Sequence, residues 1–128
     1  MRVVAAFALL AGPLAAQTVD CANAVAQVEL NFCAEAEFRS ADADLNVAYK
    51  AARERMRQID AQLAAPQRGA EIALRDAQRA WVTFRDQACL AEAYVFAGGS
   101  AQPMVYSGCL GRVTAQRAAD LWSLGREY

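Results

Sequence analysis

Histidine is absent from this 128-residue chain, and proline and glycine are scarce, with three and seven residues. Without an imidazole, a general base would have to be a carboxylate, Lys50 or a tyrosine. No Gly-x-Ser-x-Gly elbow surrounds Ser100 or Ser107, and Gly98-Gly99-Ser100 is too short for a phosphate-binding loop. We therefore predict that the protein is not an enzyme and uses no cofactor.

The four cysteines include no Cys-x-x-Cys pair, which, together with the lack of histidine, argues against a metal site or a redox dithiol. In an exported chain, an even number of cysteines indicates disulfides. Cys89 precedes a predicted loop and Cys109 follows it, which favours a Cys89–Cys109 bond and leaves Cys21–Cys33. The other two connectivities remain open at this stage, because sequence does not choose among them.

The first sixteen residues have the outline of a secretory signal peptide. They contain Arg2, an apolar run over residues 3–10, a Gly12-Pro13 break and a small-residue end at Ala16. The run is too short to cross a membrane, and no cysteine follows for lipid attachment, so we expect no membrane anchor. We predict cleavage within a residue or two of Ala16, which leaves residues 17–128 as one periplasmic or secreted domain.

The formal net charge is −1, and it becomes about −2 once Arg2 is removed, which argues against nucleic acid as a partner. Its distribution is uneven. Six carboxylates and a single arginine lie between residues 20 and 44, and four basic residues with one glutamate follow between residues 50 and 57. We interpret these acidic and basic stretches as ordinary solvent-exposed helix faces. The alternative is that the acidic stretch is a weak docking surface for a cationic partner.

Apolar periodicity predicts an all-α fold, beginning with a short helix near Asn23 that carries Val25, Val28, Phe32 and Cys33. Ser40, followed by acids, is a possible new N-cap, so we expect a break there, with one continuous helix as the alternative. The first long helix then follows. Its apolar stripe consists of Leu45, Tyr49, Ala52, Met56, Ile59 and Leu63.

A break at residues 64–69 and a second long amphipathic segment predict an antiparallel helical hairpin. Folding the chain about residue 68 places Met56 near Trp81 and Ala52 near Phe84. We expect Trp81 and Phe84 to be core residues, each contributing about 2–3 kcal/mol. The full stripe comprises Leu74, Ala77, Trp81, Phe84, Ala88, Ala91 and Val95.

A second stripe on the same segment, formed by Val82, Cys89, Ala93 and Phe96, needs another partner. A third, C-terminal helix can supply it after the Gly98-Gly99-Ser100 loop. Its marker residues are Leu110, Val113, Arg117, Leu121 and Leu124. The predicted architecture is thus a hairpin of two long helices with a short N-terminal helix and a third helix, stapled by two disulfides.

Polar residues are interleaved with these stripes. They either hydrogen-bond across the bundle and fix its register or face outward as a recognition surface, and we favour the structural role. These residues are Asn46, Gln78, Arg79, Arg85 and Asp86.

A series of motifs extends over nearly all of the predicted mature part of the chain. They are Cys21, Glu29-x-Asn31-x-Cys33, Asp42-x-x-Leu45-Asn46-x-x-Tyr49, Gln78-Arg79-x-Trp81-x-x-Phe84-Arg85-Asp86-x-x-Cys89, Gly98-Gly99-Ser100 and Cys109-x-x-x-x-Thr114-x-x-Arg117-x-x-x-Leu121. In this combination the sequence resembles the LprI-like lysozyme-inhibitor N-terminal domain family. The resemblance implies an exported helical domain with disulfides and, for the named member, inhibition of lysozyme. We therefore expect lysozyme as a protein partner.

A physical mechanism for inhibition of lysozyme can be derived from the charges and the loop of this chain. Lysozymes cut with two carboxylates in a cleft, and c-type enzymes are generally basic outside it. The acidic stretch from Glu29 to Asp44 would speed encounter, and a protruding loop over residues 97–106 would block the cleft. Its expected contact residues are Gly98, Gly99, Ser100, Gln102 and Tyr106. The alternative is a periplasmic interaction or envelope-stress module that binds another envelope protein or cell-wall component.

Overall fold

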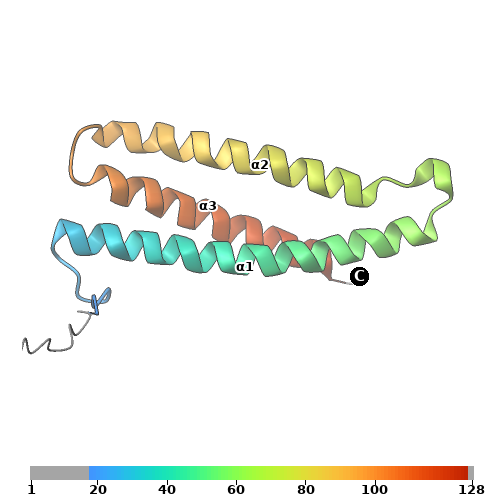
Figure 1. Ribbon diagram of the computed structural model, residues 1–128, viewed down its shortest axis with the longest axis horizontal. Helices are drawn as coiled ribbons and strands as arrows, with labels where there is room; N and C mark the ends of the chain where they lie inside the picture. Colours follow the sequence, from blue (N-terminus) through green and yellow to red (C-terminus); the bar gives the residue numbers. More distant parts are fainter. Residues whose placement is uncertain (1–17, 127–128) are drawn as a thin grey trace, which may run out of the picture.

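The computed structural model describes residues 18–126, which form three long helices, of which the first and third run in one direction and the second runs back in the opposite direction (Figure 1). Two single-turn 3₁₀ helices interrupt the connections, and the described part of the chain contains no strand, so the all-α prediction is confirmed. The predicted signal peptide lies outside the described residues. The elements are α1 (Gln27–Gln62), η1 (Ala65–Gln67), α2 (Ala70–Ala93), η2 (Tyr94–Phe96) and α3 (Gln102–Gly125).

Helix α1 is continuous over 36 residues, so the predicted break at Ser40 is wrong. The predicted short N-terminal helix is the first part of α1, which begins at Gln27 rather than near Asn23. Ser40 lies exposed on the helix surface, while residues on both sides of it pack against α3. Packing on both sides keeps the helix intact, because most helical stability in proteins comes from such tertiary contacts.

The most extensive helix contact in the bundle joins α1 to α3, which run parallel, and not α1 to α2. Gly111 lies against the backbone of Phe38, and Gly125 lies against the backbone of Ala51 and Ala52. Residue numbers increase in the same direction along both helices between these two contacts, as expected for a parallel pair. The predicted α1–α2 hairpin exists, but its contact is much smaller than the one between α1 and α3.

Two clusters form the core. The larger contains Leu45, Ala48, Ala52, Leu74, Ala118 and Leu121, with Tyr49, Met56, Trp81 and Trp122 partly buried against it. The smaller surrounds the Cys89–Cys109 disulfide, with Leu110 buried and Phe38, Tyr106 and Val113 partly buried. In the apolar stripe predicted for the first long helix, Leu45 and Ala52 are buried and Tyr49 and Met56 are partly buried, so the prediction is confirmed at these four positions.

The prediction of Phe84 as a core residue is wrong, because this side chain is 66% exposed. Helix α2 is rotated so that Arg85, rather than Phe84, faces the other two helices. Val25, Val28 and Phe32 near the start of α1 are also exposed. Within residues 18–126, none of the helices is both long and apolar enough to span a membrane.

Candidate functional site

The bundle end that carries the α2–α3 connection, here called the loop end, comprises residues 21–33 and 89–109. Two disulfides fix it: Cys21–Cys33 ties the segment before α1 to α1, and Cys89–Cys109 ties α2 to α3. The favoured connectivity is therefore confirmed. The connection between α2 and α3 is closed on a covalent base, which limits the conformations its backbone can adopt.

The connection itself is shorter than predicted, because α3 already begins at Gln102 and residues 97–101 complete the turn. Gly98 has a φ of +78°, a conformation that favours glycine. Its N–H donates to Gln102 Oε1 at 3.2 Å, and Asn31 Nδ2 of α1 donates to Ser100 O at 3.2 Å. The loop is therefore a compact turn bonded to α1, and the expected protrusion over residues 97–106 is wrong.

The five residues expected to contact a partner lie together at the loop end, but their exposure differs. Gly98, Gly99 and Ser100 are exposed, whereas Gln102 is partly buried and bonded within the loop. Tyr106 is partly buried against the Cys89–Cys109 cluster. The first three positions are thus the ones open to a partner.

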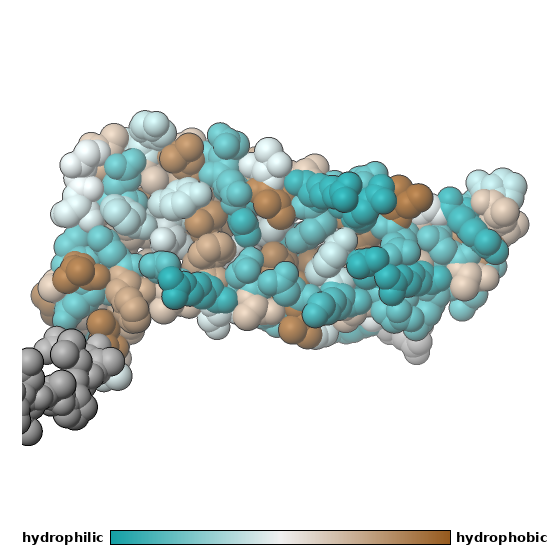
Figure 2. Space-filling view, in the orientation of Figure 1, coloured by the Kyte–Doolittle hydropathy of each residue, from teal (hydrophilic) through white to brown (hydrophobic). Residues whose placement is uncertain are grey.

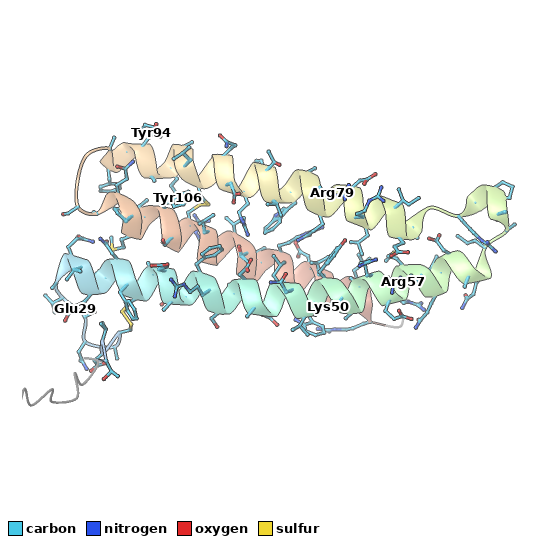
Figure 3. All side chains as sticks on the ribbon, viewed as in Figure 1. Glu29, Lys50, Arg57, Arg79, Tyr94 and Tyr106 are labelled. Atoms are coloured by element: carbon cyan, nitrogen blue, oxygen red, sulfur yellow. A yellow bond between two sulfur atoms is a disulfide. The ribbon has the colours of Figure 1, made fainter. Side chains whose placement is uncertain are left out.

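Exposed apolar side chains gather at the same end, on the segment leading into α1, on its first turns and on η2. Brown surface is visible near the start of α1 in Figure 2, and Figure 3 labels Glu29 and Tyr94 at this end. Such exposed apolar groups with a polar surround are typical of protein interaction sites. They are Val25, Val28 and Phe32 near the start of α1 and Tyr94, Val95 and Phe96 in η2.

Four of the carboxylates considered as an acidic docking surface have partners within the protein. The surface is therefore less available than the sequence indicates, since these carboxylates already serve the fold. The contacts are Glu29 Oε2 with the N–H groups of Val25 and Ala26, Glu35 with Arg39, Asp42 with Arg85 at 3.7 Å, and Asp44 with Trp122 Nε1 at 3.0 Å.

Arg85 is the central polar residue of the bundle and is only 8% exposed. Its guanidinium lies 5.4 Å from the ring centre of Phe38 and 5.2 Å from that of Trp81. It forms an ion pair with Asp86 at 2.8 Å and approaches Thr114 Oγ1 at 3.4 Å. Together with Asp42, these contacts connect all three helices, which supports the structural role favoured for Arg85 and Asp86.

The other interleaved polar residues have different surroundings. Arg117 Nε donates to Gln78 Oε1 at 3.0 Å across α2 and α3, and its guanidinium lies 5.9 Å from the Trp81 ring centre. Asn46 instead bonds within α1, to the backbone oxygen of Asp42. Arg79 is exposed on α2. Gln78 and Arg117 therefore join helices, whereas Asn46 does not.

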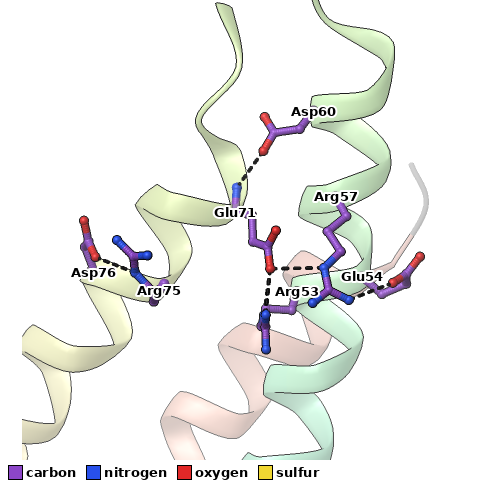
Figure 4. Close-up of polar contacts among 7 residues, drawn as sticks. All are labelled: Arg53, Glu54, Arg57, Asp60, Glu71, Arg75 and Asp76. Carbon is purple, nitrogen blue, oxygen red and sulfur yellow. Dashed lines mark hydrogen bonds and ion pairs between the residues drawn. The ribbon is translucent and has the colours of Figure 1, made fainter. Parts of the chain in front are cut away.

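Asp60 and Glu71 organise the α1–α2 turn (Figure 4). Asp60 accepts hydrogen bonds from the N–H groups of Gly69, Ala70 and Glu71, at 2.8, 2.9 and 3.1 Å. The bond from Gly69, followed by those from Glu71 and Ala70, holds the pKa of Asp60 below its ordinary value of 3.8. Asp60 thus satisfies the free N–H groups at the start of α2.

Glu71 holds two arginines of α1 through one carboxylate oxygen. Its Oε1 accepts from Arg53 Nη2 at 2.8 Å, from Arg53 Nε at 3.0 Å and from Arg57 Nε at 3.0 Å. The hydrogen bond from Arg53, with a smaller contribution from Arg57, lowers the pKa of Glu71 below its ordinary value of 4.5. Arg57 also pairs with Glu54 at 3.5 Å, so Glu54 and Glu71 together balance the charge of the two arginines (Figure 4).

A surface hollow of about 440 Å³ lies between α1 and α2 and is here called the arginine hollow. Apolar periodicity along the sequence does not indicate this hollow. The signal that could have found it is the spacing of Arg75 and Arg79, which puts both on one face of α2. Its lining residues are Tyr49, Arg53, Arg75, Gln78, Arg79 and Val82.

Residues 18–126 contain no group of three or more side chains placed to hold a metal ion. Among known families, Lysozyme inhibitor LprI matches residues 20–121. The chain belongs to the LprI family. This is an inhibitor family and not an enzyme family.

Two individual proteins are similar to the chain. An uncharacterized protein of Rhizobium meliloti (strain 1021) is 43% identical over 108 residues, which cover 82% of this chain and 78% of that protein. The crystal structure of a DUF1311 family protein from Pseudomonas putida KT2440 superposes with a TM-score of 0.65 at 26% identity. The superposition covers 78% of this chain and 94% of that one. The helical arrangement thus recurs in a solved structure.

Proposed function

We propose that the protein is exported, binds lysozyme through its loop end and blocks peptidoglycan hydrolysis. In this proposal, residues 1–16 are a signal peptide and residues 17–128 are the mature domain. Family membership over residues 20–121 supports an inhibitor function, and two disulfides support an oxidising, extracytoplasmic location. The observation that carries the choice of surface is the set of exposed apolar side chains at a covalently fixed end.

The fixed backbone of the loop end suits tight binding, because a surface that is already ordered loses little conformational entropy on association. Hot spots in protein interfaces are enriched in tyrosine and other large side chains that become fully desolvated. Phe32, Tyr94 and Phe96 are 51%, 62% and 47% exposed and can lose that exposure when a partner binds. Gly98, Gly99 and Ser100 let the partner approach the backbone closely.

In this proposal, acidic residues near the loop end increase the rate at which the protein associates with lysozyme. Glu37 is exposed on α1 near the apolar residues, whereas its neighbour Glu35 is paired with Arg39. Carboxylates beside an apolar contact surface attract a basic partner over the distance set by ionic strength. We therefore expect association with a basic lysozyme to slow as salt rises, while the dissociation rate changes little.

The test is a lysis assay with the purified mature protein and lysozymes of several classes. We expect slower lysis of peptidoglycan by at least one class. Phe32→Ser combined with Tyr94→Ser should weaken inhibition by about tenfold or more, since both residues lie at the proposed contact. The matched control is Phe84→Ser, which removes an exposed phenylalanine on α2, outside the loop end.

The assay distinguishes a failure of the proposed function from a failure of the proposed binding surface. Normal lysis at saturating protein with every lysozyme class would refute the function, and equal loss in the control would refute the choice of surface. A short chitin oligosaccharide that occupies the lysozyme cleft provides a further check. If the loop end enters the cleft, this oligosaccharide should raise the apparent dissociation constant of the complex by a factor of one plus the ratio of its concentration to its own dissociation constant.

A further inference from the structure

The arginine hollow lies apart from the loop end, in the half of the molecule nearer the α1–α2 turn. Figure 2 shows hydrophilic side chains gathered over both helices in this half, and Figure 3 labels Lys50, Arg57 and Arg79 there. A volume of about 440 Å³ lies within the range of roughly 300–1,000 Å³ that small-molecule sites occupy. The hollow is therefore large enough for a compact organic molecule.

All the charged side chains that line the arginine hollow are positive. Three guanidiniums, from Arg53, Arg75 and Arg79, line the hollow, and no carboxylate is among the lining residues. Among residues 18–126, Arg79 has no carboxylate within ion-pair distance. The partner of Arg75 is its sequence neighbour Asp76, and this pair is exposed, so it is weakly held and can be exchanged for a ligand.

Arg53 is oriented before any ligand arrives. Its Nε and Nη2 atoms both donate to Glu71 Oε1, at 3.0 and 2.8 Å, and this leaves Nη1 free. A guanidinium has five N–H donors in a fixed plane, so holding one edge sets the direction of the rest. Glu71 also accepts from Arg57, which has Glu54 as a second partner at 3.5 Å.

The remaining lining is partly apolar and is anchored to the bundle. Tyr49 packs against the larger core cluster, and Val82 is partly buried. Gln78 is held by Arg117 of α3. An aromatic ring and a branched side chain form a surface on which a ring or another compact apolar body can lie.

We propose that the arginine hollow binds a compact ligand that carries two negatively charged groups, carboxylates or phosphates, on a body that rests on Tyr49 and Val82. Arg53 and Arg79 hold the anionic groups from the two facing helices, and Arg75 exchanges Asp76 for the ligand. Arginine suits such groups because its planar donors match the oxygens of carboxylates and phosphates.

Calorimetric titration of the mature protein tests the proposal, with two probes at low ionic strength. A nucleoside diphosphate, which carries two phosphates on a ring-bearing body, represents a phosphate source, and a peptidoglycan stem peptide with free carboxylates represents a carboxylate source. We expect saturable binding of at least one probe with 1:1 stoichiometry, weakened by added salt. The probe that binds more tightly identifies the source.

Variants locate the site. Arg79→Gln and Arg75→Gln should each weaken binding by about tenfold, as expected for the loss of a charge-assisted hydrogen-bonding group. Arg112→Gln is the matched control, because Arg112 is an exposed arginine of α3 that lines a different hollow. Absence of binding by both probes, or an equal loss with Arg112→Gln, would overturn the proposal. Lysozyme inhibition should be unchanged in Arg79→Gln, so this test and that of the proposed function fail independently.

Discussion

Gly111 of α3 lies against the backbone of Phe38 in α1, so closely that a Cβ atom on Gly111 would be 3.4 Å from the Phe38 Cα and N atoms. Ala118 and Gly125 follow at intervals of seven residues on α3, and Ala118 is fully buried. These small residues let two parallel helices approach without bulky side chains between them. The closest contact in the bundle therefore depends on residues with little apolar surface of their own.

Replacing Gly111 with leucine should destabilise the protein by about 1–3 kcal/mol, because the larger side chain has to separate α1 and α3 or distort them. Gly108→Leu is the control in the same helix, since a Cβ at Gly108 would meet nothing within 4 Å. Urea unfolding followed by circular dichroism measures both. Equal stability of the two variants would show that α1 and α3 are not closely packed at Gly111.

The same contact explains which parts of the fold the sequence could predict. Leu45, Ala52 and Leu121 follow regular apolar periodicity, and their burial was predictable from it. Gly111 and Ala118 are small and add little to a hydrophobic pattern, so the parallel α1–α3 contact was not foreseen. The inward face of α2 was missed because Arg85 is charged, and periodicity places charged residues outside.

The candidate site shows a similar division. The cysteine positions around the predicted helices favour the observed disulfide pairing, but the structure was needed to choose it over the other two connectivities. The arginine hollow could not be predicted from sequence. It forms because Arg53 of α1 and Arg79 of α2 line one space, and the distance between these residues in the sequence does not indicate that they are close in the fold. The loop length was overestimated, since Pro103 marks the first turn of α3 rather than part of the loop.

Phe84 and Leu121 provide a test of the observed rather than the expected core. Phe84→Ser should change stability by no more than about 0.5 kcal/mol, because the side chain is largely exposed. Leu121→Ala should cost about 2–5 kcal/mol, because Leu121 is fully buried and its truncation leaves a cavity. Thermal and urea unfolding of both variants would measure the contrast, and a large loss for Phe84→Ser would contradict the rotation of α2.

Stability should fall on acidification partly through Asp60 and Glu71. The pKa of each is lower in the folded protein than its ordinary value of 3.8 or 4.5, so the unfolded chain takes up protons first as the pH falls. The stabilisation from these groups is thus present above about pH 4.5 and is lost as the pH falls through the lowered pKa values.

The measurement for this prediction is the urea midpoint between pH 7 and pH 3. Asp60→Ala should lower the midpoint at pH 7, and its difference from the unmodified protein should shrink towards pH 3. Asp76→Ala is the control, because Asp76 is exposed and accepts from Arg75 without capping a helix. A difference for Asp60→Ala that stays constant with pH would exclude the proposed role of its carboxylate.

Arg85→Lys should destabilise the protein by about 1–2 kcal/mol even though the charge is kept, because a single lysine ammonium cannot contact both rings and bond both acids at once. The planar guanidinium lies over Phe38 and Trp81 and also pairs with Asp86. Arg79→Lys is the control, since Arg79 is exposed and outside this cluster. Unfolding experiments on Arg85→Lys, Trp81→Leu and the double variant should give less than additive losses, because both substitutions remove the same contact. Strictly additive losses would mean that Arg85 acts through its ion pairs alone, and the ring contacts would then contribute nothing measurable to the bundle.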